Sequence, residues 1–190
     1  MRGRSAALIT GLAIAGTVFA ASPATAKPIE KVRFHDVGVS DVFDCDGTPA
    51  QDEFNVRGHF TVKLRRSSPF PYFKDHVQGK VSTINLDTGG AYTNRFTANS
   101  KDHRIVNNGD GTITITVRGT GSSKWYDQFG NLVLKDTGLI RFAVDIDFNG
   151  TPSDPSDDTE VPDSFRILRN TGRNDTEGRD FCEDLVLFTS

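Results

Sequence analysis

The segment that decides the fold is Phe54-Asn55-Val56-Arg57-Gly58-His59-Phe60-Thr61-Val62-Lys63-Leu64-Arg65. Apolar residues and Gly58 occupy every even position, and polar residues occupy every odd position. Because successive side chains of a strand point to opposite faces, this period of two predicts a long strand with one apolar and one wet face. Gly58 in the apolar row predicts a bend or the close approach of another backbone segment.

The same alternation returns at 112–117 and 140–148. Weaker strand patterns cover 31–37, 76–86, 91–97, 124–128, 131–135, 164–169 and 184–188. Asn, Asp and Gly residues that tolerate positive φ separate these segments, at 87–90, 107–111, 130–131 and 149–150. Sequential strands joined by such short turns form antiparallel meanders.

The predicted fold class is therefore all-β. Long alternating strands favour an antiparallel β-barrel, lipocalin-like or a similar up-and-down meander, because closure removes exposed sheet edges. A β-sandwich is the alternative. Two segments are predicted to be connections: 67–71, which holds two prolines, and the glycine-rich 119–123. The C-terminal segment 180–188 fits a short helix or a last strand equally well.

The chain has 190 residues with 22 basic and 25 acidic side chains, for a net charge of −3. Two arginines, an apolar run at 6–21 and Ala24-Thr25-Ala26 are typical of a secretory signal peptide at 1–26. The remainder, 27–190, is expected to be a single secreted β-rich domain with an acidic loop at 149–163 and no transmembrane segment. Acidic composition with scattered Lys and Arg argues against nucleic acid as a partner.

The two cysteines, Cys45 and Cys182, are predicted to form a disulfide, because an even count in an exported chain indicates pairing. Such a bond closes a long loop and is expected to contribute roughly 4–5 kcal/mol in the chain-entropy account. A metal or redox pair is the alternative. The sequence lacks a CxxC motif, and no histidine stands near either cysteine, so we favour the structural bond.

Three turn motifs occur in a fixed order: Asn85-Leu86-Asp87-Thr88-Gly89, Gly109-Asp110-Gly111-Thr112 and Asp136-Thr137-Gly138. With an early and a late cysteine, the chain resembles a group of small secreted actinobacterial proteins of unknown function. The resemblance covers nearly all of 27–190 and implies one β-rich exported domain with one disulfide. It implies no catalytic residues. The acidic loop at 149–163 departs from that pattern, in which a short hairpin turn stands here.

One motif points to a metal. Asp145, Asp147 and Asn149, followed by Gly150, match the opening half of a calcium loop, whose alternate oxygens converge on one cation. The closing bidentate Glu is absent, because Ser156 stands at its position. Calcium is therefore a possible cofactor here, and no other is expected; the alternative is a solvated strand face and turn.

The expected function is that of a non-enzymatic binding module for an apolar small molecule or a cell-envelope component. Apolar ligands fit because many phenylalanines lie on the predicted inward rows, and an eight-stranded barrel either fills its interior or holds one small molecule. Cell-wall anions fit a small basic group at Lys63, Arg65 and Arg66. The alternatives are a barrel isomerase or hydrolase that uses carboxylates, and a calcium-assisted adhesive or structural protein.

Overall fold

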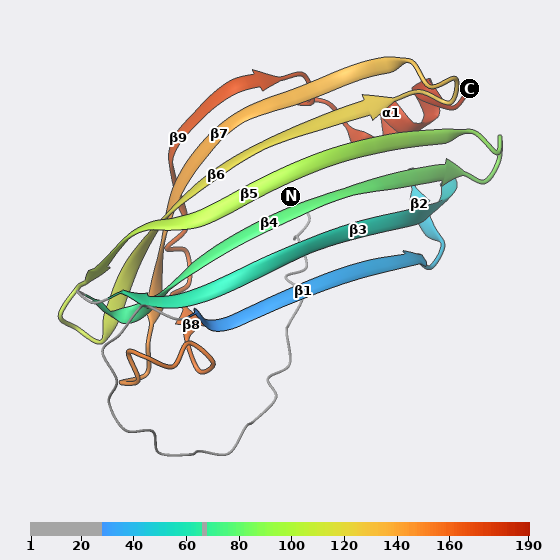
Figure 1. The fold of residues 1–190 in the computed structure, drawn as a ribbon. Coiled ribbons are helices and arrows are strands. Elements are labelled where there is room, and N and C mark those ends of the chain that lie inside the picture. The colour runs from blue at the N-terminus through green and yellow to red at the C-terminus, as the bar shows by residue number, and fades with distance from the viewer. Residues whose placement is uncertain (1–27, 66–67) are drawn as a thin grey trace.

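The computed structural model describes residues 28–65 and 68–190, and the predicted signal peptide at 1–26 lies outside them. Figure 1 shows long strands arranged in one curved sheet with a short helix near the C-terminus. The elements are β1 (Pro28–Val39), β2 (Phe43–Cys45), β3 (Thr48–Arg65), β4 (Ser68–Asn85), β5 (Ala91–Asn107), β6 (Thr112–Tyr126), β7 (Leu132–Asp147), β8 (Thr159–Glu160), β9 (Arg166–Asn174) and α1 (Phe181–Phe188). No helix in these residues is long and apolar enough to span a membrane.

All strand pairs are antiparallel, and β3 to β7 form an up-and-down meander in sequence order. At one edge of the meander, β1 and β2 both pair with β3. At the other edge, β8 and β9 both pair with β7. The all-β class and the meander are thus confirmed, and short turns join the strands as expected.

The predicted barrel closure is not observed. Within the described residues the nine strands form one open sheet, in which β1 and β9 are not paired with each other. Alternation defines an apolar and a polar face but does not require the edges to meet, so it cannot distinguish an open from a closed sheet. The exposed side chains of β1 and β9 include Lys31, Arg33 and Arg169, and charged edges discourage pairing with further strands.

Two predicted connections are strand instead. Pro69 and Pro71 lie within β4, where the register with β3 shifts between Leu64 and Arg65. Prolines are tolerated at such irregularities, because the missing N–H interrupts no regular ladder there. The glycine-rich stretch 119–123 lies inside β6 and pairs with β5 and β7 throughout.

The two faces of the sheet differ in what covers them. We call the side of the sheet that carries Tyr92 and Trp125 the inner face. The rings of both residues lie against α1, and Tyr92 is stacked on Phe188. Phe54 and Phe60, predicted to be inward, lie on this face and are only half-buried. The opposite side is the outer face. Away from α1, no second layer of described residues covers the inner face.

The most buried residues gather at the end of the sheet next to α1 (Figure 1). The cluster contains Cys45, Ala50, Tyr92 and Leu185. Segment 180–188 is therefore a helix, and its N-cap is Asp180, whose side chain accepts hydrogen bonds from the amides of Cys182 and Glu183.

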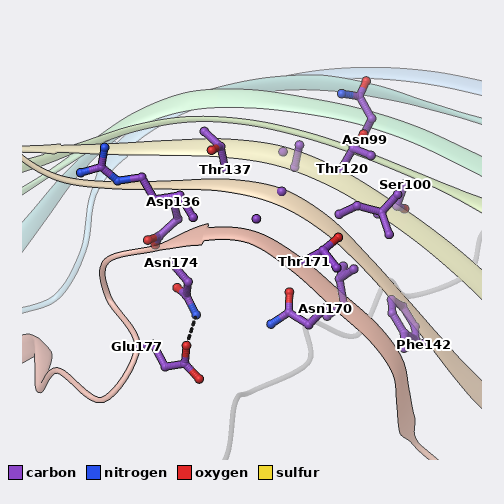
Figure 2. A pocket seen from close by; sticks show the side chains of 18 residues that line it. Asn99, Ser100, Thr120, Asp136, Thr137, Phe142, Asn170, Thr171, Asn174 and Glu177 are labelled. Carbon is purple, nitrogen blue, oxygen red and sulfur yellow. Dashed lines mark hydrogen bonds between the residues drawn. The ribbon is translucent and has the colours of Figure 1, made fainter.

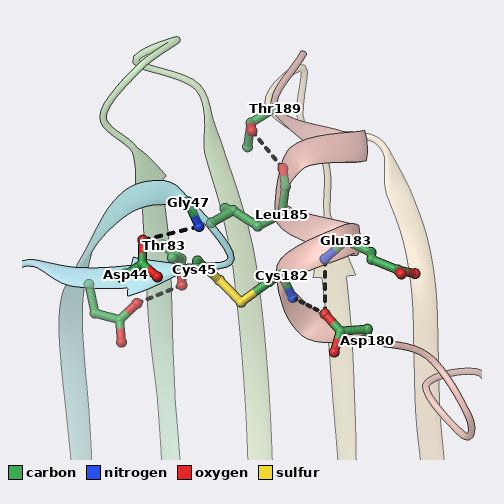
Figure 3. Close-up of a disulfide and its surroundings, with 10 residues drawn as sticks. Asp44, Cys45, Gly47, Thr83, Asp180, Cys182, Glu183, Leu185 and Thr189 are labelled. Atoms are coloured by element: carbon green, nitrogen blue, oxygen red, sulfur yellow. Dashed lines mark hydrogen bonds between the residues drawn. A yellow bond between two sulfur atoms is a disulfide. The ribbon is translucent and has the colours of Figure 1, made fainter.

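The disulfide between Cys45 and Cys182 is present, with Cα atoms 5.2 Å apart. It links β2 to the first turn of α1, as Figure 3 shows. The C-terminal end of α1 is held by Thr189, whose hydroxyl accepts a hydrogen bond from Asn85 on β4. The helix thus closes one end of the inner face and leaves the rest of that face open.

Candidate functional site

A transverse row of small residues crosses the inner face. Its members stand directly opposite one another on successive strands: Gly58, Val77, Ala98, Gly121, Gly138 and Gly172. A Cβ at Gly58 would lie 2.6 Å from the carbonyl oxygen of His76, and one at Gly121 would lie 2.8 Å from that of Thr97. At these glycines the backbone of the neighbouring strand leaves no room for a Cβ, whereas Val77 and Ala98 in the same row carry side chains.

A hollow of about 680 Å³ opens over this row, with Ala98, Gly121, Gly138 and Gly172 at its floor. Its volume lies within the range of small-molecule sites. Because glycines contribute no side chain, a ligand in this hollow would contact bare backbone over most of the floor.

The hollow is apolar at one end and polar at the other. Phe142 lines the more apolar end together with Ile140, which stands opposite Asn170, whereas Asp136, Asn174 and Glu177 line the polar end (Figure 2). Asp136 and Phe142 are six positions apart on one face of β7, which corresponds to roughly 20 Å. The site thus suits an elongated amphiphile better than a compact polar molecule.

The polar end is built by hydrogen bonds between strand and loop. The carboxylate of Asp136 accepts from the amide of Thr176 at 3.2 Å and from its hydroxyl at 2.7 Å. Asn174 donates to Glu177 at 3.5 Å. Arg173 also lines the hollow, but its guanidinium is paired with Asp175. Both carboxylates keep further acceptor capacity, so this end of the hollow favours a hydroxyl or ammonium group on the ligand.

Charge is segregated between the two faces. Every Lys and Arg within the described strands lies on the outer face, as the strand registers show. Most acids of the long strands lie on the inner face, namely Glu30, Asp36, Asp52, Asp75, Asp102 and Asp136, whereas Glu53, Asp145 and Asp147 lie on the outer face. A chain that is acidic overall therefore carries one strongly basic surface.

The basic residues of the outer face form two transverse ladders. The first ladder runs across β4, β5, β6, β7 and β9 through Lys74, Lys101, Arg118, Arg141 and Arg169. The second ladder runs across β4 to β7 through Lys80, Arg95, Lys124 and Lys135. Within each ladder the neighbours are directly opposite in register, so like charges face each other on every strand pair.

The residues of the calcium motif lie at the end of β7 and in the turn after it. The carboxylate of Asp145 binds the Arg166 guanidinium at 3.0 and 3.1 Å and accepts from Thr114 at 2.7 Å, and these bonds lower its pKa. Asp147 accepts from the amide of Asn149 at 2.8 Å, and Asn149 itself has a left-handed φ of 46°. Calcium at this turn stays a prediction, and an ion bound to Asp145 would have to displace Arg166.

Another group of potential metal ligands, found among the described residues, contains Asp46, Asp180 and Cys182. Cys182 is bonded to Cys45, so its sulfur is not a thiolate, and Asp180 caps α1. The group is thus explained by the closed end of the sheet. Of the predicted basic group, Lys63 and Arg65 lie on the outer face, and Arg66 lies outside the described residues.

Comparison of the chain with protein-family models, with curated proteins and with solved structures finds no match. The resemblance to small secreted actinobacterial proteins therefore stays a prediction. The function has to be argued from the two faces of the sheet.

The sequence reasoning missed both the glycine floor and the ladders. The motif 119–123 was assigned to a connection, although it supplies the middle of the floor. Lys and Arg are scattered along the sequence, because residues that stand opposite each other in a ladder are distant from each other in the chain. A signal was present nonetheless, since Arg95 and Lys101 fall in the polar row of one strand, without an acid between them in that row.

Proposed function

We propose that this protein binds an amphiphilic small molecule on its inner face, over the glycine floor. The observation that carries the proposal is the uncovered apolar face with a hollow of about 680 Å³. Apolar surface that no second layer covers is favourable to bury against a ligand, by roughly 25 cal/mol per Å² of apolar area. The disulfide and the predicted signal peptide agree with a secreted binding protein.

The ligand is oriented along β7 in this proposal. Its apolar body lies toward Ile140 and Phe142, and its hydrogen-bond donor lies toward Asp136 and Glu177. A hydroxyl or ammonium head group suits the carboxylates, whereas a carboxylate head group would be repelled by them. The proposal therefore includes a preference among head groups of equal tail length.

A pair of neighbouring substitutions tests the site. Ala98→Trp places a large ring on the floor from a residue that already has a Cβ, so the backbone need not move. Thr97→Trp adds the same ring to the other side of the sheet, from a neighbouring residue that does not line the hollow. The probe is N-phenyl-1-naphthylamine, an uncharged dye whose fluorescence rises in apolar sites.

We expect saturable dye binding by the parent and by Thr97→Trp, and at least tenfold weaker binding by Ala98→Trp. Dye competition should rank a long-chain alcohol or amine above the carboxylic acid of the same length. Equal binding by the two tryptophan variants, both shown to be folded by circular dichroism, would refute the inner-face site. A preference for the acid would refute the assigned orientation alone.

A further inference from the structure

The outer face carries a set of cations that no part of the described chain neutralises. No side chain of either ladder forms an ion pair with a carboxylate in residues 28–65 and 68–190. The ion pairs of the outer face are Arg166 with Asp145 and Arg173 with Asp175, and both lie outside the ladders. The ladders are thus unpaired charge in register.

Such ladders are unfavourable for the isolated protein, because like charges directly opposite in a sheet destabilise it. A single nitrogen atom in the first ladder also lacks a partner. The Nε of Arg141, in the middle of this ladder, is buried and makes no hydrogen bond to described residues. A guanidinium of this kind is suited to a bidentate oxyanion.

The surface beside each ladder is hollowed. A hollow of about 320 Å³ is lined by Lys74, Lys101 and Arg118 of the first ladder. A larger one, of about 800 Å³, is lined by Lys80, Arg95 and Lys124 of the second. Cations that line hollows can contact an anion from several sides, and the low-dielectric walls strengthen the field there.

We propose that the outer face binds a linear phosphodiester polymer whose repeating units are polyols. Neighbouring strands lie about 4.8 Å apart, so the first ladder presents a line of positive charge roughly 19 Å long. The two ladders are six residues apart along β5, or roughly 20 Å. A flexible anionic chain can follow one ladder and cross to the other.

The band between the ladders selects for hydroxyl groups. On β4 to β7 six of its eight side chains are uncharged amides or hydroxyls, namely Gln78, Thr97, Asn99, Thr120, Ser122 and Thr137, and the other two are His76 and Leu139. The amides and hydroxyls donate and accept hydrogen bonds, as polyol hydroxyls require. The chemistry of the band thus matches the part of the polymer between its phosphates.

Among the described residues, the tyrosines of the outer face are a poor platform for single-stranded nucleic acid. Proteins that hold such strands stack the bases on aromatic rings. Tyr72 and Tyr126 are the tyrosines beside the ladders, and Arg65 lies 3.5 Å above the first ring while Arg95 lies 5.2 Å from the second. Arginine already occupies these ring faces, which favours a polymer without bases.

The experiment measures binding of fluorescently labelled poly(glycerol phosphate) by anisotropy over a range of NaCl concentrations. Lys101→Gln/Arg118→Gln removes two adjacent charges of the first ladder. Lys31→Gln/Arg33→Gln is the matched control, because it removes one Lys and one Arg from the same face on exposed positions of β1. Competitors are oligodeoxythymidylate with the same number of phosphates and phosphatidylglycerol vesicles.

We expect the ladder pair to weaken binding about tenfold and to reduce the salt slope by roughly 1.4, from about 0.7 per contact on a single strand. The control pair should change affinity less than twofold. An equal loss in both variants, or no binding by the parent, would overturn the proposal. Tighter binding of oligodeoxythymidylate or of vesicles would overturn the polymer class. Dye binding on the inner face should be unchanged in every variant.

Discussion

Arg118 on β6 and Arg141 on β7 stand directly opposite each other on the outer face of the sheet. Each has a second cationic neighbour, Lys101 for Arg118 and Arg169 for Arg141. The like charges on four neighbouring strands, β5, β6, β7 and β9, therefore repel one another along this line. The backbone hydrogen bonds of the sheet hold the strands together despite this repulsion. Removing one of the charges should therefore change the free energy of unfolding by a measurable amount.

Removing the central charge should stabilise the folded protein. We expect Arg118→Gln to raise the free energy of unfolding by about 0.5–1 kcal/mol at low salt, since two like-charge contacts disappear. Added NaCl should raise the melting temperature of the parent and narrow its difference from the variant. Arg166→Gln is the control, because Arg166 is paired with Asp145. Its substitution should leave the free energy of unfolding unchanged or should lower it. A destabilised Arg118→Gln would contradict the repulsion.

Asp102 makes stability depend on pH. It is 8% exposed, its carboxylate accepts from the amide of Phe73 at 2.7 Å, and burial raises its pKa from 3.8 to about 6. The folded state therefore holds this proton between pH 4 and pH 6, where the unfolded state releases it. The group favours folding most below pH 4, and this contribution is lost as the pH rises through 6.

The substitution Asp102→Asn isolates this effect, because the amide oxygen can still accept from Phe73 and carries no charge. We expect the stability of the parent relative to Asp102→Asn to fall between pH 4 and pH 7, by on the order of 2 kcal/mol. Urea denaturation at a series of pH values measures the difference. A difference that rises with pH would show that the carboxylate is stabilised as an anion.

The disulfide should carry much of the stability of the closed end. Cys45 and Cys182 are 137 residues apart in sequence, so the bond restricts a large loop of the unfolded chain. We expect Cys45→Ser/Cys182→Ser to lose about 4–5 kcal/mol in the chain-entropy account. Fluorescence of Trp125, the one tryptophan of the chain, should report release of α1, because its ring lies 6.1 Å from that of Phe181. A loss below about 1 kcal/mol would contradict this role.

The glycine floor should not tolerate a methyl group. At Gly138 an added Cβ would overlap the carbonyl oxygen of Thr171 on β9. We expect Gly138→Ala to destabilise the protein by about 1–3 kcal/mol, as overpacking does, and to weaken dye binding. Thr137→Ala, on the outer face of the same strand, should have a smaller effect on stability. Equal stability of the two variants would show that β7 and β9 can separate without loss.

Much of the fold could be predicted from local pattern. The period of two in Phe54–Arg65 identified β3, and the Asn-Gly and Asp-Gly turns identified the meander. Gly58 is predicted to mark a bend or a close approach, and the close approach is confirmed, because a Cβ at this position would lie 2.6 Å from the carbonyl oxygen of His76. Closure could not be predicted, because an open edge and a paired edge use the same alternating sequence.

The candidate sites depend on register, which local pattern does not give. Arg118 faces Arg141 only because the β6–β7 turn sets which residues are opposite, and one residue of slippage would move every side chain to the other face. Gly121 was assigned to a connection because glycine is rare in strand interiors. Its role in the glycine floor follows from the register, which places Gly121 opposite Gly138 and Gly138 opposite Gly172.

The position of the disulfide also bears on how the molecule is made. Synthesis proceeds from the N-terminus, so Cys45 waits for 137 further residues before its partner exists. Until then α1 cannot cover Tyr92 and Ala50, and this end of the nascent sheet exposes apolar side chains to its surroundings. The disulfide can therefore form only when almost the whole chain has been made, and a chain without it has no covalent link that holds α1 over this apolar cluster.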